Sequence, residues 1–272
     1  MKKTIIILAI IIFICVFPLF FIIKDKPLKI LLFNSGKSDS ILITYKDKVI
    51  LIDTALESYS NEIINYLNNK KIKKIDYLII THFDKDHVGG ASKIIDNFDI
   101  KNVYQSNYIK TSEYYDNYIN SLNKKGIKPI TIENNYTFKL DDLNLTIYGT
   151  NIVYDSDTSN NSSLVTLLKY KSNSFLFTGD IENDRIKDFV NEDINNIDVL
   201  KMPHHGRYNK QLKKLIDKTK PKYVVITTSN EEKEDDKTVE LLNQKNIKYY
   251  STRKGKVLVL SDGKNITVKY ND

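Results

Sequence analysis

Residues 81–90 of the chain read THFDKDHVGG and continue an apolar run, DYLIIT, that is typical of a buried β-strand. Four candidate metal ligands follow this run where the chain turns toward a helix: His82, Asp84, Asp86 and His87. Residues two apart in an extended segment face the same way, so His82 and Asp84 can share one cation. Asp86 and His87 lie past the bend and can face a second. A lone His–Asp pair is usually a surface hydrogen bond, but four such residues within six favour a metal site.

The histidines of the chain are not scattered, because all four lie in two short windows. The second window is KMPHHGRYN at residues 201–209, where His204 and His205 follow an apolar strand. A third candidate is Asp180, which ends the run FLFTGD; for this residue alone a helix N-cap is an equally good interpretation. Sites in α/β proteins assemble where strand ends share one edge of a sheet, so we expect the three segments to meet.

The composition limits the kinds of metal site and catalytic motif that the chain can form. A single cysteine among 272 residues excludes a disulfide framework and a cysteine-based zinc site, so any metal must be held by His, Asp or Glu. Of only nine glycines, Gly89 and Gly90 close the first histidine window, where they allow close backbone approach. GKS at residues 36–38 lacks the earlier glycine of a phosphate-binding P-loop, and no GxSxG elbow of a serine esterase occurs.

The net charge is +7; residues 1–26 contribute +3, from four lysines and Asp25, which leaves +4 for the rest.

From Pro27 onward, short β-branched runs alternate with polar helical stretches, which is the pattern of a mixed α/β protein. The runs KILLF, SILITY and VILIDT predict an antiparallel meander at the start. Further strands are predicted at 76–81, 102–105, 145–148, 163–170, 175–180, 198–202, 222–228, 248–252 and 256–261, and helices near 61–69, 88–97, 113–125, 183–190, 210–219 and 237–246. Strands followed by strands alternating with helices recur in both halves, which predicts two sheets packed face to face with helices outside. No linker-like stretch interrupts residues 27–272, so we predict one domain there.

Residues 4–23, TIIILAIIIFICVFPLFFII, carry no charge and are long enough to cross the hydrocarbon core of a bilayer. We therefore expect an N-terminal membrane anchor at residues 1–26, formed by one transmembrane helix. The run is too long for a cleaved signal peptide, and Ile14 is too bulky to precede a lipidated Cys15; a buried core helix is the remaining alternative. Lysines flank both ends, so their count does not fix the orientation. The lack of cysteine beyond Cys15 fits an extracytoplasmic hydrolase domain.

The histidine windows belong to a series of motifs along the chain: FNSGKSDSILI at residues 33–43, VILIDT at 49–54, THFDKDHVGG at 81–90, NNSSLV at 160–165, FLFTGDIE at 175–182 and VLKMPHHG at 199–206. In this order they resemble the metallo-β-lactamase superfamily, and within it the hydrolase domains of ComEC-type competence DNA-uptake proteins. THFDKDHVGG resembles the HxDxDH form of the superfamily's metal loop. The resemblance runs from about Lys29 to Ser261, almost all of the chain after the apolar run.

The resemblance implies a four-layer αββα sandwich, the metallo-β-lactamase fold, with two divalent metal ions, zinc or manganese, at one edge. It implies a first metal held by His82 and Asp84, a second held by Asp86, His87 and one of His204 or His205, and Asp180 as a bridge between them. Asp86 and Asp180 would then be the catalytic carboxylates. The implied activity is that of a metal-dependent hydrolase, in which a hydroxide shared by two cations attacks the substrate.

Two departures from the superfamily pattern concern the first metal. Asp84 stands where the superfamily has a second histidine, which leaves an oxygen-rich site and makes manganese as suitable as zinc. The superfamily's histidine before the bridging Asp is missing; Asn161 and Ser163 lie in its region, and we predict that they bind substrate or water. Asp235 or Asp236 would be a replacement for a further ComEC-type histidine, although a solvated acidic loop is the simpler interpretation. The first metal is therefore expected to be weakly held or absent.

The residues after the histidine pair indicate a class of substrate. Arg207 and Tyr208 follow His205, and Lys210 begins a lysine-rich stretch, so we predict that Arg207 and Lys210 bind phosphate oxygens. Lysine-rich helices are also common as solvated faces. The prediction is a phosphodiesterase or nuclease that acts on a phosphodiester or nucleic-acid substrate. The alternatives are a hydrolase of other cell-envelope esters or lactams, such as a phosphorylcholine esterase, and a non-catalytic membrane-tethered binding module. The sequence names no protein partner.

Overall fold

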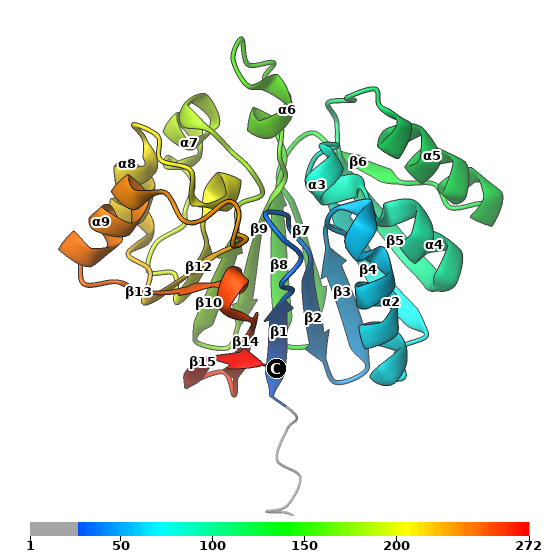
Figure 1. The fold of residues 1–272 in the computed structure, drawn as a ribbon, viewed down its shortest axis with the longest axis horizontal. Coiled ribbons are helices and arrows are strands. Elements are labelled where there is room, and N and C mark those ends of the chain that lie inside the picture. Colours follow the sequence, from blue (N-terminus) through cyan, green and yellow to red (C-terminus); the bar gives the residue numbers. More distant parts are fainter. Residues whose placement is uncertain (1–26, 272) are drawn as a thin grey trace, which may run out of the picture.

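The computed structural model describes residues 27–271, which form two β-sheets packed face to face with helices on both outer faces (Figure 1). These are the four layers that the sequence predicts. The predicted membrane anchor at residues 1–26 lies outside the described residues. Within residues 27–271, no helix is both long enough and apolar enough to cross a bilayer.

The first sheet has eight strands in the order β15-β14-β1-β2-β3-β4-β5-β6. Its strands are β1 (Leu28–Leu32), β2 (Ile41–Tyr45), β3 (Lys48–Ile52), β4 (Lys74–Ile80), β5 (Asp99–Ser106), β6 (Ile130–Ile132), β14 (Lys256–Ser261) and β15 (Ile266–Asn271). The predicted meander is confirmed, because β1, β2 and β3 pair antiparallel with Ile43 opposite both Ile30 and Ile50. From β3 to β6 the pairing is parallel, so these strands all end at one edge of the sheet.

The second sheet has seven strands in the order β13-β12-β11-β10-β9-β8-β7. Its strands are β7 (Tyr136–Leu140), β8 (Leu143–Tyr148), β9 (Val165–Tyr170), β10 (Asn173–Phe177), β11 (Val199–Lys201), β12 (Tyr223–Ile226) and β13 (Lys248–Ser251). Pairing is antiparallel from β7 to β10 and parallel from β10 to β13. The second half of the chain thus repeats the order of the first half, as the sequence predicts.

The helices cover the two outer faces (Figure 1). Those beside the first sheet are α2 (Ser60–Asn69), α3 (Lys85–Val88), α4 (Ala91–Asn97) and α5 (Glu113–Lys125). Those beside the second are α7 (Asn183–Phe189), α8 (Leu212–Thr219) and α9 (Asp236–Gln244), while α6 (Thr158–Asn161) projects above the sheets. Three short 3-10 turns complete the elements: η1 (Glu57–Tyr59), η2 (Pro203–Gly206) and η3 (Thr252–Lys254).

Three buried clusters hold the layers together. In β1, Ile30 and Leu32 face the core between the sheets, whereas Leu31 faces the cluster beneath the helices of the first sheet. In α8, Leu212, Leu215 and Ile216 recur at the helical period and pack onto the second sheet. Because each central strand is buried on both faces, its sequence is a continuous apolar run, which is why these strands are visible in the sequence.

Three strands escape the sequence prediction, and each is an edge strand: β6 and β15 of the first sheet and β7 of the second. In β7 no residue is fully buried, and Tyr136 is 40% exposed. Edge strands have one open side, so their residues need not be apolar and the periodic signal is weak.

The strand ends that carry the predicted site lie at the upper edge of both sheets (Figure 1). The loop after β1, the ends of β3 and β4, and the loops after β10 and β11 all open there. The start of β1, the β2–β3 turn and the end of α2 lie at the opposite, lower end. The two ends of the molecule therefore present different sets of side chains.

Candidate metal centre

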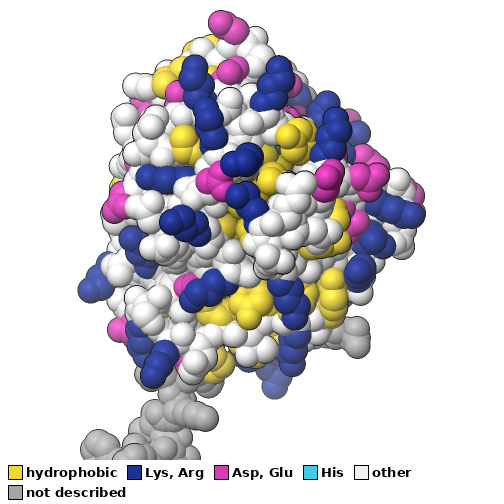
Figure 2. Space-filling model, turned by 90° about the vertical axis from the view of Figure 1, so that its left-hand side faces the viewer, with side chains coloured by type: hydrophobic (Ala, Val, Ile, Leu, Met, Phe, Trp, Pro, Cys, Tyr) yellow, Lys and Arg dark blue, Asp and Glu magenta, His cyan; other side chains and the backbone are white. Residues whose placement is uncertain are grey.

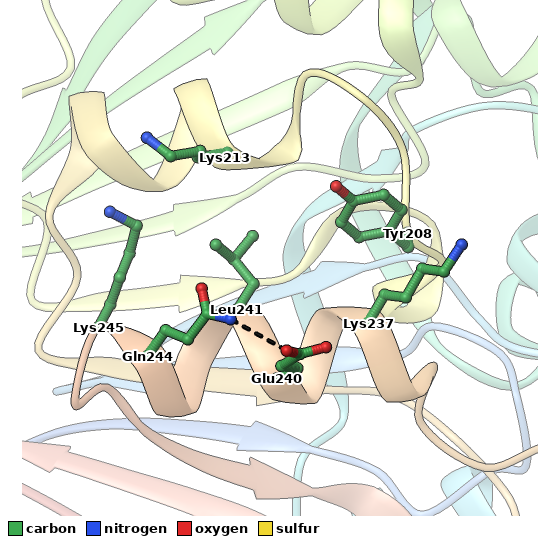
Figure 3. Close-up of a pocket in the computed structure, with 7 residues that line it drawn as sticks. All are labelled: Tyr208, Lys213, Lys237, Glu240, Leu241, Gln244 and Lys245. Atoms are coloured by element: carbon green, nitrogen blue, oxygen red, sulfur yellow. Dashed lines mark hydrogen bonds between the residues drawn. The ribbon is translucent and has the colours of Figure 1, made fainter.

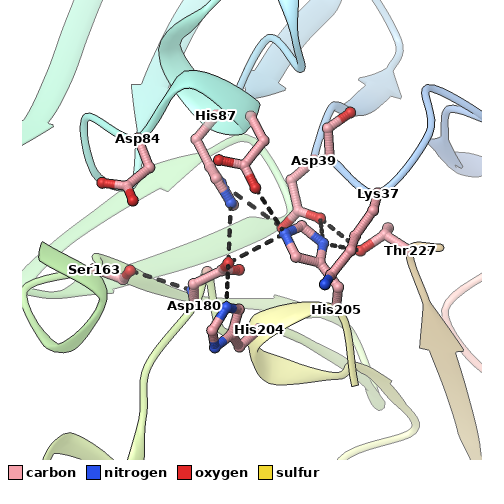
Figure 4. Close-up of polar contacts among 12 residues, drawn as sticks. Lys37, Asp39, Asp84, His87, Ser163, Asp180, His204, His205 and Thr227 are labelled. Atoms are coloured by element: carbon pink, nitrogen blue, oxygen red, sulfur yellow. Dashed lines mark hydrogen bonds and ion pairs between the residues drawn. The ribbon is translucent and has the colours of Figure 1, made fainter. Parts of the chain in front are cut away.

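Four side chains converge at the upper edge: Asp86, His87, Asp180 and His205, here called the four-residue cluster. Their ligand atoms all lie within 4.8 Å of one another. Asp180 Oδ2 is 3.2 Å from His87 Nε2 and 3.1 Å from His205 Nε2, and Asp86 Oδ2 is 3.2 Å from His205 Nε2. Figure 4 shows both imidazoles directed at Asp180. The three segments meet as the sequence predicts, and the geometry selects His205 over His204 for this cluster.

Unusual backbone conformations aim the second histidine window. His204 and His205, in η2, have φ angles of 45° and 52°, which non-glycine residues rarely adopt. In this conformation both neighbouring imidazoles reach the same carboxylate: His204 Nε2 lies 4.0 Å from Asp180 Oδ2, and His205 Nε2 lies closer. Strained residues of this kind gather at functional sites, where the surrounding structure enforces them.

The first histidine window is tied to the end of β3. Thr54 donates two hydrogen bonds to the carbonyl of His87, from its backbone N at 2.8 Å and its Oγ1 at 2.9 Å. A Cβ added at Gly90 would lie 2.4 Å from the carbonyl oxygen of Thr54, and one at Gly89 would lie 2.8 Å from the backbone N of Glu57. The prediction that Gly89 and Gly90 allow close backbone approach is therefore confirmed.

Asp53, fully buried at the end of β3, orients the imidazole of His87. Asp53 Oδ2 lies 2.8 Å from His87 Nδ1, and the carboxylate also accepts from the backbone N and the hydroxyl of Thr81, at 2.8 and 2.7 Å. A partner on Nδ1 leaves Nε2 to face Asp180. A carboxylate behind a histidine is the usual support for a metal ligand, because it fixes the ring and raises its basicity.

A buried lysine supports the other side of Asp180. Lys201 of β11 is 1% exposed; its Nζ donates to the carbonyl of Gly179 at 3.1 Å, lies 3.3 Å from Asp180 Oδ1 and forms an ion pair with Asp39. Asp39 Oδ1 accepts from Thr227 Oγ1 at 2.7 Å, and that hydroxyl lies 2.9 Å from Nδ1 of His205. Lys201 thus engages one oxygen of Asp180 and leaves Oδ2 to the imidazoles.

The charges of the cluster shift one another's pKa values. Burial alone lowers the pKa of His205, but the surrounding carboxylates, Asp180 foremost, raise it to about 10. Burial also opposes the charged form of His87, yet Asp180 and Asp53 raise its pKa well above the ordinary value. Burial raises the pKa of Asp180, and the two imidazoles and Lys201 hold it well below its usual range. The imidazoles are therefore held in an environment that strongly attracts positive charge.

His82 and Asp84, the predicted ligands of a first metal, are placed differently. His82 is buried with its Nδ1 3.2 Å from Ser163 Oγ, and its Nε2 has no hydrogen-bond partner among the described residues. Burial and the neighbouring His87 lower the pKa of His82 to about 4, so this imidazole is neutral at pH 7. Asp84 Oδ1 lies 4.0 Å from His82 Nε2, but the carboxylate is paired with Lys110 at 2.7 Å and accepts from Ser159. In Figure 4, Asp84 stands apart from the four-residue cluster.

His204 lies at the rim of the cluster rather than inside it. Its side chain is 16% exposed, and its Nδ1 is hydrogen-bonded to Glu182, a buried residue that follows Asp180 by two positions. Glu182 fixes the ring of His204 with Nε2 facing Asp180. The two histidines of the second window therefore differ, because only His205 is completely enclosed by the other ligands.

The structure corrects one predicted substrate contact. Asn161 is fully buried; its Oδ1 accepts from the backbone N of Glu182 at 2.9 Å and of Arg185 at 3.3 Å, and its Nδ2 donates to Ser156 O at 2.8 Å. Its amide thus caps the start of α7, which makes it a structural residue. Ser163 is also fully buried, with its Oγ near both His82 and the backbone N of Asp180, where it positions these two residues.

The other predicted substrate residues, Arg207 and Lys210, are exposed and follow the η2 turn in the chain. Among the described residues, neither side chain makes a hydrogen bond or an ion pair. They are free to contact a ligand, and their predicted role in binding phosphate remains a prediction.

Three residues of the centre are absent from the sequence-based set: Asp39, Asp53 and Lys201. Asp53 has the same signal as Asp180, since it is an acid that directly follows an apolar strand, VILID. Asp39 lies within the motif FNSGKSDSILI without a distinctive neighbour. Lys201 precedes the histidine pair on an apolar strand, where a lysine normally reaches the solvent.

The residues present fit a divalent cation. The four-residue cluster offers two imidazole nitrogens and two carboxylate oxygens, a donor set that suits zinc or manganese. Nε2 of His82 and Nε2 of His87 are buried, and neither has a hydrogen-bond partner with acceptable geometry among the described residues. This is expected of imidazole nitrogens that bind a metal. Asp53 and Thr227 hold the far nitrogens of the two cluster imidazoles.

Two known proteins are similar to this chain in sequence. ComE operon protein 3 of Bacillus subtilis is 25% identical over 239 residues, which cover 80% of this chain and 31% of that protein. Recombination protein 2 of Haemophilus influenzae is 28% identical over 201 residues, which cover 71% of this chain and 23% of that protein. This chain therefore spans less than a third of the length of either relative. The predicted resemblance to ComEC-type proteins is confirmed.

Structural and family comparisons give the same fold. The crystal structure of the metallo-β-lactamase fold protein YhfI from Bacillus subtilis superposes with a TM-score of 0.57 at 10% identity, covering 90% of this chain and 100% of that one. A sequence model described as the metallo-β-lactamase superfamily matches residues 34–229, which contain all residues of the four-residue cluster. The chain belongs to the metallo-β-lactamase superfamily and is a metal-dependent hydrolase.

Proposed function

We propose that this hydrolase cleaves phosphodiester bonds and that nucleic acid is its natural class of substrate. The proposal rests on one observation above all: exposed cationic and aromatic side chains, Arg207, Tyr208 and Lys210, directly follow the η2 turn that carries the histidine pair. Cationic side chains this close to His205 in the sequence can hold phosphate oxygens beside the four-residue cluster. An exposed aromatic ring can stack on a base.

A groove extends from Tyr208 between α8 and α9. It has a volume of about 540 Å³, and Figure 3 shows Tyr208 and Lys237 near one end and Lys213 and Lys245 toward the other. Figure 2 shows basic side chains around apolar surface on this face of the molecule. Asp217 pairs with both Lys213 and Lys245, whereas Lys237 lies 5.8 Å above the ring of Tyr208. The groove is suited to a strand of nucleic acid that leaves the cluster past Tyr208.

We also propose which residues hold the cations. Asp86, His87, Asp180 and His205 hold the more tightly bound ion, and His82 and Asp84 hold a weaker one, with zinc or manganese as the metal. A divalent ion bound there supplies a nucleophile from water at neutral pH and neutralises charge on the phosphate. Lys201 holds Asp180 Oδ1 in place, and the ring of His204, fixed by Glu182, faces the same carboxylate from the exposed side.

The relatives support the substrate class by their names alone. Recombination protein 2 is named for recombination, a process that acts on DNA, whereas the name of ComE operon protein 3 gives its operon and no substrate. Because the chain spans less than a third of either protein, their complete activities are proposals for this chain. The proposed metal ligands lie within residues 34–229, the stretch that matches the metallo-β-lactamase superfamily model.

The test compares three chromogenic substrates and one single-stranded DNA. Each is offered to the full chain loaded with zinc or with manganese. We expect turnover of bis-p-nitrophenyl phosphate and of short single-stranded DNA, with little turnover of nitrocefin or p-nitrophenyl phosphorylcholine. Turnover of only the lactam or the choline ester would overturn the proposal. An Arg207→Ala variant should raise KM for DNA more than for the small diester, because only the polymer offers several phosphates.

For the location of the enzyme, we propose that residues 4–23 anchor the chain in a membrane and that the hydrolase domain is extracytoplasmic. The support is the uncharged apolar run itself, which has the length of a membrane span. Protease treatment of intact cells that express the full chain should remove the domain from the outside. Protection of the domain in intact cells, with loss only after lysis, would contradict the proposed side.

A further inference from the structure

We propose that a lysine-rimmed pocket at the lower end of the molecule binds the headgroup of an anionic membrane lipid. The pocket has a volume of about 570 Å³ and lies where β1 begins, between the β2–β3 turn, the end of α2 and the start of β4. Seven of its seventeen lining residues are lysines. It lies at the end of the sheets opposite the metal centre, so the proposed catalytic role gives it no function (Figure 1).

The charge of the rim is largely uncompensated. Three of the lysines have acidic neighbours: Lys48 pairs with Asp47, Lys74 with Asp76 and Lys46 with Asp142. The other four are Lys29, Lys70, Lys71 and Lys73, which are all exposed and have no acidic partner among the described residues. Like charges held this close repel one another, so they favour an anion between them.

The floor of the pocket is apolar. Leu31, Leu42, Val49 and Leu258 line it together with the half-buried ring of Tyr66. A free anion such as phosphate would use only the lysines. A lipid uses both features, because its phosphate meets the rim and its glycerol and first methylene groups meet the floor.

The position of the pocket also favours a membrane. Pro27 lines it, and the apolar run 4–23 ends five residues before Leu28. Five extended residues span at most about 18 Å, so an inserted run would keep this end of the domain near the bilayer surface. Lysines held near a membrane surface are attracted to anionic lipid headgroups, and this attraction falls off within a Debye length, so proximity to the bilayer is what the rim requires.

The apolar run itself is a poor occupant of the pocket. It is flanked by Lys2, Lys3, Lys24 and Lys26, with Asp25 as the one acidic residue in the first 26 positions. Its flanks would bring further positive charge to the lysine rim.

The absence of tryptophan from the chain provides a direct probe. A Tyr66→Trp variant of the full chain places a single fluorophore on the pocket floor, where the native ring packs edge-to-face on Phe33. The chain is reconstituted into nanodiscs of phosphatidylcholine alone and of phosphatidylcholine with phosphatidylglycerol. We expect the emission of the introduced tryptophan to shift to shorter wavelength only in the discs with the anionic lipid.

Two triple lysine variants in the Tyr66→Trp background distinguish binding at the pocket from a general effect of surface charge. Lys70→Gln, Lys71→Gln and Lys73→Gln together should abolish the shift, and because these residues are exposed the fold should persist, as circular dichroism would verify. Lys124→Gln, Lys125→Gln and Lys128→Gln remove the same charge beside α5, away from the pocket, and should retain the shift.

Four results would overturn the proposal. Equal emission in the two kinds of disc, or an equal loss in the two triple variants, would show that the pocket does not recognise the lipid. A shift produced in phosphatidylcholine discs by inorganic phosphate would assign the lysines to a soluble anion. A shift produced there by a short single-stranded DNA would assign them to nucleic acid.

Discussion

In the four-residue cluster the shared carboxylate, Asp180, is held by a buried lysine, whereas on the His82 side the carboxylate of Asp84 is held by a lysine at the surface. Lys201 is 1% exposed, and the side chain of Lys110 is 46% exposed. The cluster carboxylate therefore faces its imidazoles in a fixed geometry, while Asp84 shares its oxygens between two neighbours: Oδ1 lies 4.0 Å from His82 Nε2, and Oδ2 pairs with Lys110 at 2.7 Å. For the metal ligands proposed above, the difference predicts one cation position with pre-oriented ligands and a second whose carboxylate is shared with Lys110.

Removal of the shared carboxylate should have the largest effect. Asp180→Asn removes one negative charge from the point where three imidazoles converge. We expect turnover to fall by at least about 10²–10³-fold, because charge stabilisation at the reacting centre is lost. Metal analysis should show less than one equivalent bound. Asp193→Asn on the exposed surface serves as the matched control, and a fully active Asp180→Asn enzyme would disprove the central role of this residue.

The support behind His87 can be compared with the support behind His82. Asp53→Asn replaces a carboxylate on His87 Nδ1, and we expect the tighter metal affinity to fall by about 10–100-fold, as for other residues behind metal ligands. Ser163→Ala removes a hydroxyl that lies near His82 Nδ1 and also accepts from the backbone N of Asp180, so it should weaken the second equivalent more than the first. Isothermal titration with zinc measures both. Equal losses of both equivalents in both variants would remove the distinction between the two sides.

The pH dependence of metal binding should also follow the cluster. The surrounding carboxylates raise the pKa of His205 to about 10, so protons compete with a cation for this nitrogen below that pH. Affinity for the tighter ion should rise with pH, by about tenfold per unit for each proton displaced. In chelator-treated protein the sign is opposite: the raised pKa stabilises the fold most below about pH 6.5, and that contribution is lost toward pH 10. Thermal unfolding with chelator measures the second effect.

The smallest effect is expected for the surface ion pair. Lys110→Ala removes the cation that pairs with Asp84 Oδ2, so the affinity of the proposed second site should increase a fewfold, since exposed ion pairs contribute about 0.2–1 kcal/mol. The first equivalent should be unchanged. Weaker binding of the second ion would show that Lys110 supports the site instead of competing for Asp84.

Much of this centre could be predicted from the sequence because metal ligands are a matter of residue type and strand ends are visible as apolar runs. His82, Asp86, His87, Asp180 and His205 were all indicated by these two signals. The predicted substrate contact of Asn161 failed because it also rested on residue type alone. Asn161 lies among the motifs, yet its amide is used to cap α7, and no local pattern distinguishes a polar residue that binds backbone from one that binds substrate.

The supporting residues were missed because their roles depend on distant partners. Lys201 lies on an apolar strand, and its ammonium group is buried only because Asp39, 162 positions earlier, and Asp180 lie beside it. Asp53 reaches His87 across 34 positions. The edge strands β6, β7 and β15 were missed for a related reason, since an edge strand is defined by its place in the sheet and not by its own residues.

The sequence by itself determined the chemistry that this protein offers: imidazoles and carboxylates without thiolates, placed after buried strands, in the motif order of its superfamily. Only the tertiary structure decided that His205 and not His204 completes the cluster, that Asp84 pairs with Lys110, and that four lysines without an acidic partner among the described residues line a pocket with an apolar floor at the far end. Donor types are covalent properties of each residue, whereas distances between donors arise from the packing of two sheets whose strands are far apart in the chain.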